Sequence, residues 1–212
     1  MNTNEIYLVD SGTGNLHSVE HTLLTLGAQV KLVRSATDLH GGGRVILPGV
    51  GAFGKFMQGL NAPQAGLAQA LAAIVQQGDP LLGICVGMQA LFEGSEELGD
   101  FAGLGILPGK VVRFPDLPGL KIPHTGWNQL TPRAQTKEGG SLLLDGMPSG
   151  AYAYFNHSYY CAPARPEDIT AVTEHGLAFA SMVQHDNVMG VQFHPEKSQQ
   201  TGLKLLANFI NA

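Results

Sequence analysis

The sequence predicts an α/β fold in which a central, mainly parallel sheet is flanked by helices, with antiparallel strands added in the C-terminal half. In the N-terminal half, short apolar strands alternate with segments whose apolar residues recur at helical spacing, which is typical of a parallel sheet covered on both faces. After about Gly103, strand-like segments are joined directly by turns rich in Pro and Gly. No repeat or long linker interrupts the pattern, so we expect one domain over residues 1–212.

The N-terminal half alternates between the two kinds of element. The predicted strands are Ile6–Val9, Val30–Val33, Arg44–Leu47 and the run from Leu81 into Cys85. The predicted helices are Leu16–Leu26, which stops at Gly27, Gln64–Gln77, which follows Pro63, and a third that begins after Cys85. In such sheets the functional site lies beyond the C-terminal ends of the strands. Cys85 and Gly49–Gly51 both follow strands, so we expect them to be neighbours in space.

The C-terminal half is predicted to be mostly strands, ending in one helix. The predicted strands are Val111–Phe114, Tyr152–Tyr160, Thr170–Thr173, Ala178–Val183 and Val188–Phe193. A final helix is expected over Ser198–Ile210, with Leu203, Leu206 and Ile210 on one face.

Composition excludes several classes of protein. A hydrophobic content of 44% in 212 residues is that of a folded globular chain, and a net charge of −5 without a Lys/Arg stripe argues against nucleic-acid binding. Two cysteines, Cys85 and Cys161, are too few for a disulfide framework, so we expect a reduced, cytoplasmic setting. We find no signal-peptide pattern and no apolar run of about 18 residues, so no membrane segment is expected.

Residues 81–92 carry the strongest candidate for chemistry. Gly83 and Gly87 lie two residues before and after Cys85, at the junction of a strand and a helix. Glycines at this spacing allow the tight turn that exposes a nucleophile, and the helix N-terminus favours a thiolate. A buried structural cysteine explains the elbow alone equally well, so other residues must decide.

A thiol nucleophile needs a base, and the base needs a group that orients it. Among eight histidines, His194 is the one that ends an apolar strand as Cys85 does. Glu196 follows two residues later, and residues i and i+2 of an extended chain point the same way. A strand end with two solvated polar residues is the alternative. Beside an elbow cysteine, we favour a triad of Cys85, His194 and Glu196.

Attack on a carbonyl creates an oxyanion, which backbone N–H groups can hold. The amide of Val86 at the helix start and the Pro48–Gly51 strand end are the two candidate sources. A dinucleotide loop at Gly12 and Gly14 is discounted, because His17 stands where the third glycine should be. His17 and His21 lie one helical turn apart, and we interpret them as solvated surface residues; no metal and no cofactor is expected.

The sequence resembles the triad-type, class I glutamine amidotransferases. GICVGMQALF surrounds Cys85, and VQFHPEKS contains His194 and Glu196. Narrower stretches are similar to the glutaminase subunits of imidazole glycerol phosphate synthase: LPGVGAFG at 47–54, PHTGWN at 123–128, YFNHSYY at 154–160 and GVQFHPEKSQ at 190–199. The resemblance covers essentially the whole chain and implies the flavodoxin-like fold of this family.

The resemblance implies hydrolysis of L-glutamine to glutamate and ammonia. Cys85 would form a γ-glutamyl thioester, with His194 as base and then acid and Glu196 as its orienting group. The residues implied for the oxyanion hole, completed by a conformational change, are Gly49, Val50 and Val86. Those implied for substrate binding are Gly51, Gln89, His157, Ser158 and Tyr159.

The resemblance also implies a partner. Ammonia would pass through the centre of a separate (β/α)8-barrel cyclase, which forms a heterodimer with the glutaminase. The cyclase would make imidazole glycerol phosphate and aminoimidazole carboxamide ribotide in histidine biosynthesis. The residues implied for the interface are Pro123, Trp127, Asn128 and Lys197. A lone tryptophan is otherwise more often part of the core.

Three positions depart from the family pattern: Ser11 and Asn156 replace a tyrosine and an apolar residue, and Thr125 replaces a methionine. They concern the partner rather than the triad. Three other functions remain as alternatives: the glutaminase of another amidotransferase, a non-catalytic regulatory subunit on the same fold, and a cysteine hydrolase that acts without a partner.

Overall fold

The computed structural model describes residues 4–39, 42–133 and 141–211, and its largest sheet has eight strands. Their order is β2-β1-β3-β4-β14-β13-β12-β9. The first five, which are parallel, are β2 (Gln29–Val33), β1 (Glu5–Val9), β3 (Arg44–Gly49), β4 (Leu81–Cys85) and β14 (Val188–Val191). The antiparallel ones are β13 (Ala178–His185), β12 (Ile169–Glu174) and β9 (Thr131–Pro132). The predicted parallel sheet with antiparallel additions is confirmed.

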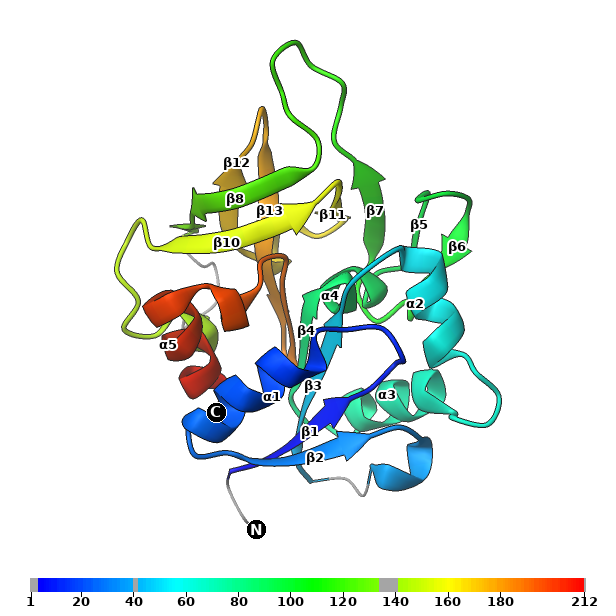
Figure 1. Ribbon diagram of the computed structural model, residues 1–212. Coiled ribbons are helices and arrows are strands. Elements are labelled where there is room, and N and C mark those ends of the chain that lie inside the picture. Colours follow the sequence, from blue (N-terminus) through cyan, green and yellow to red (C-terminus); the bar gives the residue numbers. More distant parts are fainter. Residues whose placement is uncertain (1–3, 40–41, 134–140, 212) are drawn as a thin grey trace.

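Helices cover both sides of the parallel strands. In Figure 1, α1 (Leu16–Thr25) and α5 (Gln199–Ile210) lie to one side, and α2 (Phe53–Leu60) and α3 (Leu67–Gln76) lie to the other. The short helix α4 (Val86–Ala90) follows β4 directly. Short 3-10 turns are η1 (Ala36–Asp38), η2 (Leu142–Leu144), η3 (Pro166–Asp168) and η4 (Pro195–Lys197).

Two helix predictions need correction. Helix α2 was not predicted, although its apolar residues Phe53, Phe56, Met57 and Leu60 follow helical spacing and are all buried. Helix α3 begins at Leu67 rather than Gln64, because the chain turns before it and Gly66 adopts a left-handed conformation with φ of 60°. Both differences lie in one loop-rich segment where glycines interrupt the periodicity.

Two smaller sheets extend the molecule above the C-terminal ends of the parallel strands (Figure 1). One pairs β8 (His124–Gln129) with β10 (Tyr152–His157). The other has the order β11-β7-β5-β6, with β11 (Tyr159–Pro163), β7 (Gly109–Arg113), β5 (Gly94–Ser95) and β6 (Phe101–Ala102).

Three strand predictions also need correction. The single strand expected over Tyr152–Tyr160 is two strands, because the chain bends at Ser158 and its halves pair with different sheets. Strand β8 was not predicted, since alternating polar residues and Gly126 hide it. Strand β14 ends at Val191, so His194 lies beyond the strand rather than at its last residue.

One apolar core joins these layers. Its largest fully buried side chains are phenylalanines from both halves of the chain, including Phe56, Phe92, Phe155 and Phe193. We therefore propose that residues 1–212 form one domain, although residues 1–3, 40–41, 134–140 and 212 lie outside the described part. The start of the N-terminal stretch tested for a signal peptide is among them. In the described ranges no helix is long and apolar enough to cross a membrane.

Candidate active site

Cys85 occupies the sharp turn between β4 and α4. It is both the last residue of the strand and the N-cap of the helix, with φ of 55° and ψ of −112°. This conformation is rare for a residue with a side chain, and it is characteristic of a nucleophile held on an elbow. A Cβ on Gly87 would collide with the carbonyl oxygen of Leu47, and one on Gly83 would lie 2.7 Å from the carbonyl oxygen of Gly87. Both glycines are therefore required by packing.

His194 lies beside Cys85 and is held from several directions. It lines the same pocket as Cys85, an interaction with the Cys85 side chain contributes to its raised pKa, and its Nδ1 lies 3.0 Å from Oε1 of Glu196. Its backbone N–H donates to the carbonyl of Tyr154 at 2.9 Å, and its carbonyl accepts from the Ser198 hydroxyl at 2.7 Å. The structure thus brings the three predicted triad side chains together.

The geometric reason given for Glu196 was wrong in detail. Residues 195–197 form the 3-10 turn η4 instead of an extended chain. Pro195 starts this turn, and the turn brings the carboxylate of Glu196 into contact with Nδ1 of His194. The Glu196 side chain is only 1% exposed, so its contact with His194 is shielded from water.

The electrostatics of the triad favour a charged pair. Burial by itself lowers the pKa of His194, but hydrogen bonds to Cys85 and Glu196 and the negative charges of both groups outweigh it and raise the pKa to about 10. At neutral pH the imidazole therefore keeps its proton and carries a positive charge beside the sulfur. A protonated imidazole next to a thiol is an arrangement used where cysteine acts as a nucleophile.

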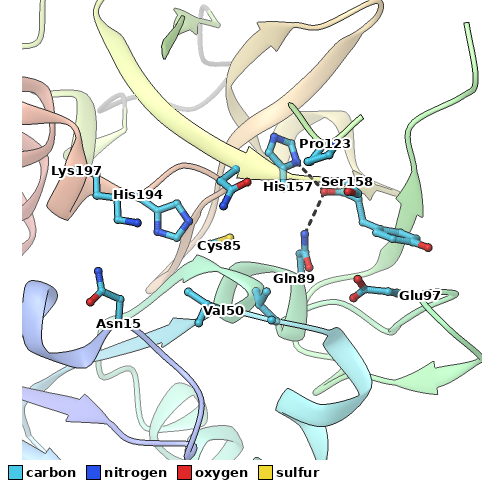
Figure 2. A pocket seen from close by; sticks show the side chains of 14 residues that line it. Asn15, Val50, Cys85, Gln89, Glu97, Pro123, His157, Ser158, His194 and Lys197 are labelled. Atoms are coloured by element: carbon cyan, nitrogen blue, oxygen red, sulfur yellow. Dashed lines mark hydrogen bonds between the residues drawn. The ribbon is translucent and has the colours of Figure 1, made fainter. Parts of the chain in front are cut away.

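A pocket of about 500 Å³ opens over Cys85. Figure 2 shows His194 and Lys197 on one side of the sulfur, and Gln89 and Glu97 on the other. Val50 and Val86 of the predicted oxyanion hole line this pocket. So do all five residues predicted to bind substrate, which are Gly51, Gln89, His157, Ser158 and Tyr159. The volume suits a ligand the size of an amino acid.

Gly49, the third residue of the predicted oxyanion hole, is not among the residues that line this pocket. It pairs with Cys85 across β3 and β4, and a Cβ there would lie 2.6 Å from the Gly87 nitrogen and 2.7 Å from Cε2 of Phe56. The glycine therefore lets the Gly49–Val50 peptide approach the elbow closely, as the sequence predicted for this strand end.

Sequence reasoning assigned no role in the pocket to three of its lining residues, Asn15, Glu97 and Asn156. Glu97 is the one carboxylate among the lining residues, and its Oε2 accepts a hydrogen bond of 2.7 Å from the backbone N–H of Phe53. Asn15 lines the opposite side of the pocket. Asn15 ends the first loop, DSGTGN, and Glu97 lies in a turn after β5, so each is brought to the pocket by a loop from a different part of the chain.

The four residues predicted for a partner interface divide into three groups. Pro123 and Lys197 line the pocket, and Trp127 is 47% exposed on β8. The Lys197 Nζ lies 5.8 Å above the ring of Tyr154, which also meets the Trp127 ring edge-on at 6.1 Å. The amide of Asn128, in contrast, points into the chain and donates to the carbonyl of Glu174 at 2.8 Å. Trp127 is therefore the large apolar side chain of this set that is exposed, and Pro123 and Lys197 are exposed beside the pocket.

A buried histidine pair connects β8 to the pocket. Nδ1 of His157 lies 2.7 Å from the carbonyl of Tyr159, which can only accept, so this nitrogen carries the proton. Nε2 of His157 must then accept from Nδ1 of His124 at 3.0 Å, and Nε2 of His124 accepts from Asn128 at 3.1 Å. Both rings are thus neutral, with assigned tautomers.

His17 and His21 are both exposed on α1, in agreement with the predicted surface role. The described residues contain no group of three or more His, Cys, Asp or Glu side chains that could hold a metal ion.

Comparison with known proteins decides the family. The model of the class I glutamine amidotransferase family matches residues 7–212 of the chain. The chain belongs to this family. It is a glutamine amidotransferase, and the resemblance in its motifs is confirmed over nearly the whole length.

Relatives of this amidotransferase are named imidazole glycerol phosphate synthase subunit HisH. The protein from Desulfitobacterium hafniense is 48% identical over 96% of this chain and 92% of its own length. Those from Moorella thermoacetica and Gloeobacter violaceus are each 47% identical, over 96% and 98% of this chain and 93% and 89% of their own lengths.

Solved structures of distant relatives share the fold of the amidotransferase. The structure of PurLQS from Thermotoga maritima matches with a TM-score of 0.72 and 18% identity, covering 98% of this chain and 97% of the other. A crystal structure of another glutamine amidotransferase matches with a TM-score of 0.69 and 17% identity, covering 96% of this chain and 98% of the other.

The two cysteines of the amidotransferase should differ sharply in reactivity. Cys85 lines the pocket, whereas Cys161 is 1% exposed and burial, followed by the charge of Cys85, raises its pKa well above the usual range. We expect iodoacetamide to modify one thiol per native chain, at Cys85, and glutamine to slow the reaction. Peptide mass spectrometry identifies the site, and equal modification of Cys161 in the folded chain would contradict the prediction.

Acid should destabilise the amidotransferase through its buried histidine pair. Burial lowers the pKa of His157 to about 3 and that of His124 to about 4, where the stacked ring of His175 contributes a further lowering. An unfolded histidine titrates near 6.5, so between about pH 6.5 and pH 4 the unfolded chain binds protons that the folded chain does not. The free energy of unfolding should therefore decrease as the pH is lowered through this range.

Urea unfolding at pH 7 and pH 5 checks this expectation. The loss of stability between the two pH values should be smaller in His157→Gln than in the unmodified chain, whatever the variant's stability at pH 7. The exposed His17 provides a matched control, since His17→Gln should leave the loss unchanged. Equal losses in all three proteins would show that other groups cause the acid sensitivity.

Proposed function

We propose that the chain hydrolyses L-glutamine with Cys85 as nucleophile, His194 as acid and base, and Glu196 as the group that orients His194. The observation that carries the proposal is the buried line of sulfur, imidazole and carboxylate at the floor of an amino-acid-sized pocket. The strained elbow at Cys85 presents the sulfur to that pocket.

In the first half of the reaction, the thiolate of Cys85 attacks the side-chain carbonyl carbon of glutamine. The resulting oxyanion lies near the N-terminus of α4, where the amide of Val86 and the Gly49–Val50 peptide are available as donors. The imidazolium of His194 gives its proton to the amide nitrogen, the C–N bond breaks, and ammonia leaves. A γ-glutamyl thioester on Cys85 remains.

In the second half, water replaces ammonia on the same face of the thioester. Neutral His194 takes a proton from the water as it attacks the thioester carbon, and the C–S bond breaks to release glutamate and the thiolate. Glu196 keeps the imidazole in one orientation through both halves, and its buried carboxylate stabilises the imidazolium each time it forms.

Glutamine can be recognised by two groups on the far side of the sulfur from His194. The amide nitrogen of Gln89 donates to the carbonyl of Tyr159 and to the side chain of Gln192, which leaves the Gln89 oxygen as an acceptor. Glu97 adds a carboxylate to the same side of the pocket. We propose that these acceptors bind the α-ammonium group of the substrate, with Ser158 and Tyr159 beside it.

The relatives' names support a finer proposal about the partner. We propose that this chain is likewise the glutaminase subunit of imidazole glycerol phosphate synthase and passes ammonia to a barrel-shaped cyclase in the cytoplasm. The exposed Trp127 and the neighbouring Lys197, close to the pocket, would meet the cyclase. The pocket lies between this face and the ends of the parallel strands, so ammonia released there has a short path to a partner.

Steady-state measurement of glutamate release, with and without the cyclase and its nucleotide ligand, tests this proposal. We expect low turnover alone and at least about a tenfold rise in the complex. Trp127→Ala should weaken the binding of the cyclase about 10- to 100-fold, as for a buried aromatic at the centre of an interface. Leu24→Ala, at a 53% exposed position on α1, is the control that should bind normally. High turnover of the chain alone would count against a coupled subunit.

A further inference from the structure

Gln192 lies between Cys85 and Gln89 but has no part in the mechanism described so far. Its side chain is fully buried, two residues before His194. Its Nε2 donates to Sγ of Cys85 at 3.8 Å, and its Oε1 accepts from Nε2 of Gln89 at 3.2 Å. A buried amide that spans the nucleophile and a substrate-binding side chain is placed to influence both.

A backbone carbonyl fixes the orientation of the two side-chain amides, those of Gln89 and Gln192. The carbonyl of Tyr159 accepts from Nδ1 of His157 at 2.7 Å and from Nε2 of Gln89 at 3.1 Å. A carbonyl cannot donate, so the nitrogen of Gln89 must face it, and the same nitrogen then donates to Gln192. The oxygen of Gln192 is thereby occupied, which leaves its N–H group facing the sulfur.

An N–H group held against the sulfur affects one protonation state more than the other. Hydrogen bonds to a charged acceptor are about twice as strong as those between neutral groups, so the donor favours the thiolate over the thiol. His194 lines the same pocket, and its interaction with Cys85 contributes to the raised pKa of the imidazole. Titratable groups that interact with Cys85 include His194 and Cys161, and the pocket around the sulfur also holds His157, Glu97 and Lys197. Gln192 adds a donor whose charge does not change with pH.

We propose that Gln192 stabilises and positions the Cys85 thiolate, with its orientation set by the Tyr159 carbonyl through Gln89. The proposal rests on the proposed role of Cys85 as nucleophile. The alternative is that Gln192 only fills space in the core. In that case, replacing Gln192 by an apolar side chain of similar size would leave the acidity and reactivity of the Cys85 thiol unchanged.

Two variants of the full chain test the assignment. Gln192→Met keeps the length of the side chain and removes the donor, and Gln192→Glu puts a carboxylate oxygen against the sulfur. For each, the rate of Cys85 alkylation by iodoacetamide is measured from pH 5 to pH 10, together with kcat and KM for glutamine. Gln184→Met is the matched control, since Gln184 on β13 is partly buried and bonds to Ser141 instead.

We expect the alkylation profile of Gln192→Met to move to higher pH by about one unit, and that of Gln192→Glu to move further. The kcat should fall about 10- to 100-fold with a smaller change in KM, whereas Gln184→Met should match the unmodified chain in both. Unchanged alkylation profiles in the two Gln192 variants, with normal modification of the unmodified chain, would overturn this inference alone. Absence of glutamine-protected alkylation at Cys85 in the unmodified chain would instead overturn the proposed function.

Discussion

Cys85→Ala should lower glutamine hydrolysis by at least about 10⁴-fold. In the proposed mechanism the sulfur forms the covalent intermediate, and without it His194 and Glu196 would have no nucleophile to assist. Ammonia-dependent synthesis by the cyclase should continue when ammonium salts replace glutamine, because the partner's own site is untouched. Glutamate release and product formation are measured in the same mixture.

Cys161→Ala is the matched control for this experiment. Cys161 is equally buried in the sheet β11-β7-β5-β6 but lies outside the pocket lining, so its loss should cost some stability and little activity. Glutaminase activity retained in Cys85→Ala would remove Cys85 from the mechanism. Lost ammonia-dependent synthesis in that variant would indicate instead that the substitution disrupts the complex.

Gly87→Ala should strongly destabilise the folded chain. A Cβ at this position would collide with the carbonyl oxygen of Leu47, a backbone atom of β3 that no rotamer change can move. Relief requires β3 and α4 to separate, which would also displace the Gly49–Val50 peptide from the elbow. We expect a loss of about 3 kcal/mol or more in the free energy of unfolding, beyond the usual cost of overpacking.

Thermal and urea unfolding of the purified chain measure this effect. Gly14→Ala is the control, because a Cβ there would meet its nearest atoms at an ordinary 3.8 Å and the residue is not in a left-handed conformation. It should change stability by less than about 0.5 kcal/mol. A Gly87→Ala chain as stable as the control would show that the elbow can widen without cost.

The elements recognised from sequence are those whose signal is local. The strand into Cys85, the glycines around it and the apolar face of α1 each lie within a few residues, where the periods of strands and helices are visible. Helix α2 carries the same kind of signal and was overlooked. The polar strand β8 carries almost none, because it is stabilised by pairing with β10, which follows much later in the chain.

The sequence by itself determined the family, the mainly parallel fold and the candidate reactive groups. The type of each residue and its spacing from near neighbours can be read directly from the sequence, so Cys85, His194 and Glu196 could be named as candidates in advance. Only the tertiary structure placed Glu97 in the pocket, exposed Trp127, and joined Gln89 to Gln192 across 103 residues of sequence. The physical reason is that burial and hydrogen-bond direction depend on which distant segments meet, and that is decided by the packing of the whole core.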